Sequence, residues 1–280
     1  MQHIQLVALD LDGTLFNEEK EISEYNKEII RRAIAAGVTV VISTGRPYCG
    51  LPFAQMEGLG IDYAITANGG GIFHLPTKTC IKDSSMEPAV AYPIIDYLLT
   101  KNIHFDVFSN GYGFSDKRCI ALVDKTPLIQ ALTNYIKSTR TIVEDMASYA
   151  RDHALNVSKI TCNFPMDEDG NMPEREEVKA ALESNPAVTC VCGGYSNLEF
   201  TARGVTKGAA LRELADILQI PVAATMAIGD TENDITILEA AGVAVAMGNA
   251  TEDVKAVADY ITTSNEEDGV AHAMEHYLGF

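Results

Sequence analysis

The sequence predicts an α/β protein: a core built on a doubly wound parallel sheet, with a second α+β domain inserted into it. At both ends of the chain, short apolar runs alternate with amphipathic helical segments, which is the pattern of parallel β-α-β units. The middle of the chain carries strands and helices separated by polar turns instead. A length of 280 residues is enough for two domains of ordinary size. We therefore expect the core in residues 1–83 and 203–280 and the inserted domain in residues 84–202.

Three apolar runs in the first part of the chain are expected to form neighbouring parallel strands, at residues 5–9, 38–42 and 63–66. They are apolar along their whole length, as strands buried on both faces are. Between the first two, Ser23 can cap an amphipathic helix that ends at Gly37.

The last part of the chain continues the same alternation. Leucines at helical spacing over residues 211–218 predict a helix, and strands are expected at residues 226–228 and 243–246. Thr251 and Asp268 are placed to cap the two final helices. Right-handed crossovers then join all the strands of both ends in one sheet.

The middle segment predicts a separate arrangement of strands and helices. Its strands are spaced by polar turns and by helices, and its loop at residues 165–176 is polar and rich in turn residues. The expected strands lie at residues 104–108, 155–164, 187–192 and 198–201, and one expected helix at residues 127–137.

Composition restricts the classes of partner. Lys and Arg number 21 against 39 Asp and Glu, which gives a formal net charge of −18 and argues against a nucleic acid or an anionic membrane as partner. The chain shows neither a secretory signal nor a stretch of ~18 apolar residues, and its six scattered cysteines fit free thiols in a reducing compartment. We expect a cytoplasmic protein that acts on a small molecule; the sequence leaves the oligomeric state open.

Four polar motifs lie where the predicted strands end or the predicted helices begin. Each motif alone also fits an ordinary turn or a helix cap, so the prediction depends on their co-occurrence. They are DLDGT at residues 10–14, STGRP at 43–47, GVTKG at 204–208 and GDTEND at 229–234.

Carboxylates dominate the first and last motifs. Asp10 and Asp12 share one side of an extended segment, so their negative charges repel each other unless a hard cation lies between them. Asp230 stands at another strand end, and Asn233 and Asp234 can face the same place from the next helical turn. Within DLDGT we also expect Gly13 to allow a sharp turn and the Thr14 hydroxyl to bond to the backbone of that turn.

The other two motifs supply groups that bind anions. The hydroxyl of Thr44 and the amides around Gly45 can hold a phosphate oxygen. Lys207 opens a helix, where a cation opposes the helix dipole unless an anion or carboxylate lies beside it. Open α/β sheets place their sites at this end of the sheet, and the combination of nucleophile, acid, cation and metal ligands suits phosphoryl transfer.

The four motifs, in this order, resemble those of the haloacid dehalogenase-like (HAD) phosphohydrolases. The large insert between STGRP and GVTKG resembles the type IIB cap of the Cof-type subfamily, and the sugar phosphatases are its most similar subgroup. Phrases such as ITANGGGIF and AIGDTENDITILEAAG add to this likeness. The resemblance covers about residues 1–83 and 203–280, and across the insert it rests on size and strand pattern only. It implies a Rossmann-type core with strand order 3-2-1-4-5.

The resemblance also implies a role for each motif residue. Asp10 would attack phosphorus to give an aspartyl-phosphate, and Asp12 would protonate the leaving alcohol and then activate water. Lys207 would neutralise both the phosphoryl group and Asp10. The phosphoryl oxygens would be held by Thr44, the backbone at Leu11 and Gly45, and Asn233. Mg²⁺ would be bound by Asp10, the Asp12 carbonyl, Asp230 and, through water, Asp234.

The function that follows is Mg²⁺-dependent hydrolysis of small phosphomonoesters, sugar phosphates above all. Two alternatives stay open at this point: a sugar phosphomutase that uses the same nucleophile, and a non-catalytic binding or regulatory protein on this scaffold. Two nearby residues have ordinary structural explanations. We expect Arg46 to pair with a carboxylate of the core and Asn68 to serve the turn that contains it.

Overall fold

The computed structural model describes residues 3–192 and 197–280, and the chain forms two compact units. The first unit consists of Met1–Arg46, Leu51–Lys82 and Thr206–Phe280, and the second of Pro47–Gly50 and Asp83–Val205. The second unit thus extends to Val205, three residues beyond the expected boundary at 202. Within that extension, the Val205 carbonyl accepts a 2.7 Å hydrogen bond from the Thr201 hydroxyl of β11.

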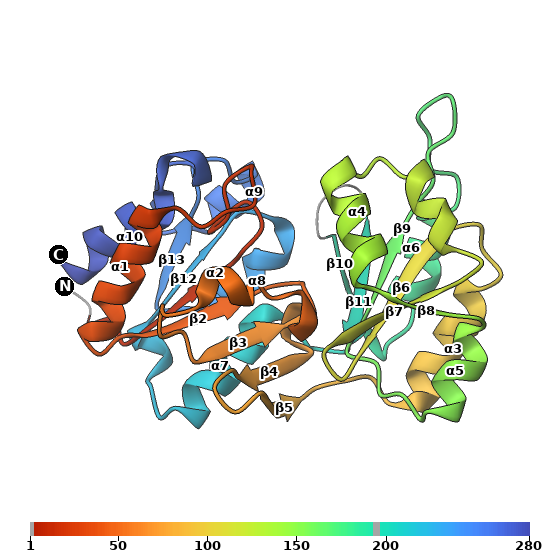
Figure 1. The fold of residues 1–280 in the computed structure, drawn as a ribbon, viewed down its shortest axis with the longest axis horizontal. Coiled ribbons are helices and arrows are strands. Elements are labelled where there is room, and N and C mark those ends of the chain that lie inside the picture. Colours follow the sequence, from red (N-terminus) through yellow and green to blue (C-terminus); the bar gives the residue numbers. More distant parts are fainter. Residues whose placement is uncertain (1–2, 193–196) are drawn as a thin grey trace. The chain divides into compact units, whose positions relative to one another are not determined.

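The first unit contains an eight-stranded sheet (Figure 1). Its order is β14-β13-β12-β1-β2-β3-β4-β5, and the pairs from β14 to β3 are parallel, whereas β4 runs antiparallel to β3. The five central strands therefore confirm the expected order 3-2-1-4-5. The strands are β1 (Leu6–Leu9), β2 (Thr39–Ser43), β3 (Tyr63–Thr66), β4 (Gly71–His74), β5 (Thr79–Asp83), β12 (Thr225–Gly229), β13 (Val243–Ala246) and β14 (Tyr260–Ile261).

Helices connect the parallel strands of this unit, as the sequence pattern predicted. α1 packs beside α10, and α7 packs beside α8. The reversal of strand order at β1, with right-handed crossovers, places helices on both faces of the sheet. The helices are α1 (Glu24–Ala35), α2 (Phe53–Met56), α7 (Lys207–Ile217), α8 (Ile235–Ala240), α9 (Glu252–Ala256) and α10 (Gly269–Leu278).

Of the predicted helix caps Ser23 and Asp268, the first caps its helix with its side chain and the second does not. The Ser23 hydroxyl accepts a 3.0 Å hydrogen bond from the Asn26 amide and caps α1 as expected. Asp268 lies at the start of α10, but its side chain makes no capping bond to that helix. Its carboxylate accepts a hydrogen bond from the Ser23 hydroxyl instead, so the two helix starts are joined to each other.

The second unit is an α+β structure with a six-stranded, mostly antiparallel sheet of order β10-β11-β9-β6-β7-β8. Within this second sheet, β7 and β8 are the one parallel pair among the residues that the structure describes, and its other neighbouring strands are antiparallel. Its strands are β6 (His104–Ser109), β7 (Tyr112–Asp116), β8 (Thr141–Val143), β9 (Lys159–Asn163), β10 (Val188–Val191) and β11 (Leu198–Ala202). Its helices are α3 (Pro88–Leu98), α4 (Gln130–Thr139), α5 (Met146–Asp152) and α6 (Arg175–Glu183). In residues 3–192 and 197–280, no helix combines the length and the apolar composition needed to span a membrane.

The two faces of this second sheet differ in chemistry, because side chains alternate along each strand. Phe105 and Ile160 belong to the apolar face and pack into the core of the unit. The opposite face carries buried ion pairs: Arg140 Nε lies 2.7 Å from Asp106 Oδ2, and Lys159 Nζ lies 2.5 Å from Glu199 Oε1. Burial alone would raise the pKa of Asp106, but the Arg140 charge outweighs it and holds that pKa well below its usual range.

Candidate active site

The centre of the candidate site is a buried ammonium group among carboxylates. Lys207 is the first residue of α7, and Asp10 follows β1 directly. Lys207 Nζ donates to Asp10 Oδ1 and to Asp234 Oδ1, both at 2.7 Å, and only 1% of the lysine is exposed. The unusual cation at this helix start is therefore explained by the carboxylates beside it, as the sequence predicted.

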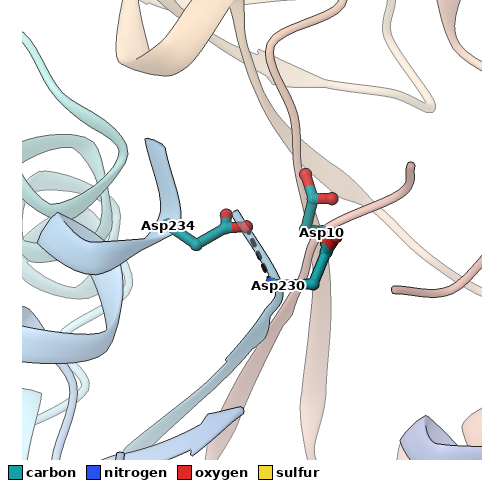
Figure 2. A group of neighbouring side chains, drawn as sticks. All are labelled: Asp10, Asp230 and Asp234. Carbon is teal, nitrogen blue, oxygen red and sulfur yellow. Dashed lines mark hydrogen bonds between the residues drawn. The ribbon is translucent and has the colours of Figure 1, made fainter. Parts of the chain in front are cut away.

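Asp230 and Asp234 belong to one tight loop after β12. The second oxygen of Asp234, Oδ2, accepts the backbone amides of Asp230 at 3.0 Å and Thr231 at 3.2 Å. Figure 2 shows the Asp234 carboxylate bonded to the Asp230 amide, with the Asp10 and Asp230 carboxylates beside each other. Both oxygens of Asp234 are thus engaged, one by Lys207 and one by the loop.

Burial and mutual repulsion raise the pKa of two of these carboxyl groups. Removal from water raises the pKa of Asp10 well above its ordinary value, and the charges of Asp234 and Asp230 add to this, although Lys207 opposes it. The pKa of Asp230 rises to about 7, first through burial and then through the Asp234 charge. Positive charge beside these carboxylates, in addition to that of Lys207, would favour their ionised forms.

The turn that follows Asp10 depends on Asp230, a contact that sequence reasoning did not find. The Thr14 hydroxyl donates to Asp230 Oδ1 at 2.7 Å, so the expectation that it bonds to its own turn is wrong. Gly13 has φ +86°, and a Cβ atom there would lie 2.3 Å from Asp230 Oδ2. The Asn249 amide also donates to the Gly13 carbonyl at 2.8 Å. Asn249 follows β13, so its place near a strand end was the available signal.

Asp12 lies in a different environment from Asp10. Arg46 binds its carboxylate with two nitrogens, Nε to Oδ2 and Nη2 to Oδ1, both at 2.7 Å. Lys20 Nζ adds a 3.2 Å contact to Oδ1. Burial would raise the pKa of Asp12, but the hydrogen bond and charge of Arg46 lower it below its ordinary value. The expected pairing of Arg46 with a core carboxylate is therefore present.

The proposed phosphate-binding residues of the first two motifs follow neighbouring strands of the sheet, and no contact described for this part of the chain joins those of one motif to those of the other. Leu11 follows β1, whereas Thr44 and Gly45 follow the neighbouring strand β2. The Thr44 hydroxyl accepts the Arg46 amide at 3.2 Å, and the Thr44 amide donates to the Ile65 carbonyl at 2.9 Å. Thr44 is thereby fixed within its own loop and against β3.

The three central carboxylates fit a hard divalent cation. Asp10, Asp230 and Asp234 each offer an oxygen, and these oxygens lie within 4.8 Å of one another. All-oxygen ligands are what Mg²⁺ prefers. Because Asp234 is already engaged by Lys207 and two amides, the donor set points to Asp10 and Asp230 as the direct ligands. The side chain of Asp12 lies outside this group, and the role of its carbonyl as a ligand stays a prediction.

The sequence profile of the haloacid dehalogenase-like hydrolases matches residues 7–274. The chain belongs to this family. Its HAD relatives include the phosphatase YwpJ of Bacillus subtilis, which is 32% identical over 98% of this chain and 100% of its own length. A second B. subtilis relative, the 5-amino-6-(5-phospho-D-ribitylamino)uracil phosphatase YwtE, is 31% identical over 98% of both chains.

Solved HAD structures share the fold over nearly the whole chain. A haloacid dehalogenase-like hydrolase from B. subtilis superposes with a TM-score of 0.85 at 31% identity, covering 98% of this chain and 99% of that one. A HAD subclass IIB sugar phosphatase superposes with a TM-score of 0.79 at 27% identity and covers 98% of both chains. The Cof-type resemblance and the α/β fold class inferred from the motifs are confirmed, and the chain is a phosphoric monoester hydrolase of the HAD type.

Proposed function

We propose that this HAD-type phosphatase hydrolyses small phosphomonoesters, sugar and sugar-alcohol phosphates in particular, with Mg²⁺ and through an aspartyl-phosphate. One observation supports the proposal most directly: Lys207 holds Asp10 at 2.7 Å, beside the Asp230 carboxylate. A buried carboxylate held by a lysine at a strand end is suited to nucleophilic attack on phosphorus.

The leaving-group preference rests on the named relatives. One relative is named for a phosphorylated ribityl compound, and one structural neighbour is a sugar phosphatase. The substrates that these names imply both carry a polyhydroxylated skeleton on the phosphate. A further relative is a pyridoxal phosphate phosphatase of Escherichia coli. These compounds share a small organic alcohol as the leaving group, which is the substrate class that we propose here.

In the proposed scheme, each side chain of the site has its own role in the reaction. Asp10 attacks phosphorus, while Lys207 offsets the negative charge of the Asp10 carboxylate and of the phosphoryl group. Thr44 and the Gly45 backbone bind the phosphoryl oxygens. Asp10 and Asp230 would hold Mg²⁺, which supplies further positive charge for the phosphoryl oxygens. Asp12 serves as acid and then as base. Because Arg46 keeps Asp12 ionised here, the acid step requires that this ion pair loosen first.

The test is a phosphatase assay with p-nitrophenyl phosphate, followed by a panel of phosphorylated sugars and sugar alcohols. We expect release of inorganic phosphate with Mg²⁺ and its loss with EDTA. Asp10→Asn should abolish turnover, since the amide is neither a nucleophile nor an equivalent metal ligand. Asp216→Asn is the matched control, because Asp216 is exposed on α7.

Three results would contradict the proposal. They are substantial activity of Asp10→Asn, full activity after exhaustive chelation, and an isomerised sugar phosphate without free phosphate. The last result would favour a phosphomutase.

A further inference from the structure

The turn after β3 ties together three of the four motifs. Asn68 lies in this turn, with a left-handed φ of +55°, and Ala67 before it has φ +51°. The Ala67 amide donates to the Arg46 carbonyl at 2.9 Å, and the Asn68 amide donates to the Thr44 carbonyl at 3.2 Å. The backbone of the turn is thus bonded to the STGRP loop.

The same turn also packs against the start of α7. A Cβ atom on Gly69 would lie 2.3 Å from the Thr206 carbonyl oxygen, so the turn approaches the residue before Lys207 without intervening side chains. Only glycine permits this approach, and its φ of +101° also favours glycine. The position of the turn relative to Lys207 is therefore fixed by backbone contact.

The side chain of Asn68 reaches the fourth motif. Its Oδ1 accepts a 3.3 Å hydrogen bond from Asn233 Nδ2. Asn233 Oδ1 in turn accepts the Thr231 hydroxyl at 2.9 Å and Lys207 Nζ at 3.4 Å. Since an ammonium group only donates, the oxygen of Asn233 must face Lys207, and its amide nitrogen must face an acceptor. Asn68 provides that acceptor.

The residue type at position 68 is informative. Glycine is the least costly residue at a left-handed φ, and three glycines follow at positions 69–71. Asparagine tolerates this conformation better than most other residues and adds an amide. Because Asn68 is 97% buried and its oxygen contacts Asn233, the side chain does more here than complete a turn.

We propose that Asn68 is a positioning residue that acts through Asn233, an inference that rests on the proposed phosphatase function. Asn68 fixes the Asn233 amide so that its oxygen stays on Lys207 while one of its two N–H groups remains for a phosphoryl oxygen. Without this acceptor, the Asn233 side chain can rotate, and Lys207 loses a neighbour that limits its motion.

A double-mutant cycle tests the proposal. Asn68→Gly removes the amide and keeps the left-handed backbone, and Asn233→Ala removes the group through which Asn68 is proposed to act. We expect kcat/KM for p-nitrophenyl phosphate to fall about tenfold in Asn68→Gly, a loss of ~1.4 kcal/mol of transition-state stabilisation. In the Asn233→Ala background the same substitution should change kcat/KM less than twofold.

A control and a second variant separate positioning from structure. Lys78→Gly changes an exposed residue at φ +55° in the same unit and should leave activity unchanged. Asn68→Asp keeps an acceptor for Asn233, so kcat should stay within about threefold of the wild-type value, while the added negative charge raises KM.

Three outcomes would overturn the proposal for Asn68. They are wild-type activity in Asn68→Gly, an equal tenfold loss in both backgrounds, and an equal collapse of kcat in the Asp and Gly variants. Each of these outcomes can be read only if the wild-type protein hydrolyses p-nitrophenyl phosphate. If the wild-type protein itself releases no phosphate, it is the proposed function that fails, and the two failures are distinguishable.

Discussion

Asp230 should make the metal-free protein less stable at neutral pH than at acid pH. Its carboxyl is buried beside Asp234, and its pKa rises from the ordinary 3.8 to about 7. The folded protein therefore binds this proton more tightly than the unfolded chain does. Where the folded state holds more protons, the free energy of unfolding falls as the pH increases. The loss should begin near pH 4 and be complete above pH 7.

The magnitude follows from the size of that pKa change. Each pKa unit corresponds to about 1.4 kcal/mol, so the ionised Asp230 costs the metal-free fold about 4 kcal/mol at pH 8. Asp230→Asn removes the ionisation and should recover most of this cost. Saturating Mg²⁺ should also offset it in the wild-type protein, because a ligand that binds only the folded state stabilises it.

The assay is urea unfolding followed by far-UV circular dichroism at pH 5 and pH 8, with EDTA or with Mg²⁺. In EDTA, the wild-type midpoint should fall between these pH values by clearly more than that of Asp230→Asn. The exposed Asp216→Asn variant should follow the wild type. Identical pH dependence in wild type and Asp230→Asn, both in EDTA, would show that Asp230 carries no such cost.

Two further predictions concern the turn and the ion pair beside the site. Gly13→Ala should reduce activity more than 100-fold and weaken Mg²⁺ binding in calorimetry, because its Cβ would displace the Asp230 carboxylate. Gly37→Ala is its control: φ is +89° there but nothing lies within 4 Å, so it should cost only about 1–2 kcal/mol of stability and keep activity. Arg46→Met should raise the pKa of Asp12 and move the Asp12-dependent limb of kcat/KM to higher pH. If the pH profile of kcat/KM is the same in Arg46→Met and in the wild type, ionisation of Asp12 does not determine that pH dependence.

The parallel core could be predicted because burial on both faces leaves a strong signal. The strands β1, β2 and β3 were expected within one residue of where they lie, since each is a short apolar run. The expected strand over residues 155–164 was less accurate, because β9 begins only at Lys159. Apolar residues before it, such as Val157, pair with Met86 in an isolated bridge instead, and local composition does not reveal such a partner.

The site residues were predictable as a set but not in their pairwise contacts. Asp10, Asp230 and Lys207 come together because strand ends and helix starts meet at one edge of a parallel sheet. The bond from Thr14 to Asp230 joins residues 216 positions apart, and no spacing rule reaches that far. The Asn68 contact to Asn233 depends on a left-handed backbone, which the sequence NGGG permits but does not require.

The charges at the centre of the site support the proposal that Asp10 acts as a nucleophile together with a cation. Three buried carboxylates and one ammonium group, all 6% exposed or less, carry a net charge of −2 when all are ionised; they are Asp10, Asp230, Asp234 and Lys207. A phosphate oxygen about 5 Å from one uncompensated carboxylate meets a repulsion of about 3 kcal/mol at an effective dielectric constant of 20. Protons can compensate these charges, as the raised pKa values of Asp10 and Asp230 indicate. A protonated Asp10, however, cannot attack phosphorus, so proton uptake removes the repulsion only by removing the nucleophile. A divalent cation held by the same oxygens neutralises the charge of −2 and leaves Asp10 ionised, and for this reason we expect the metal to bind before the substrate.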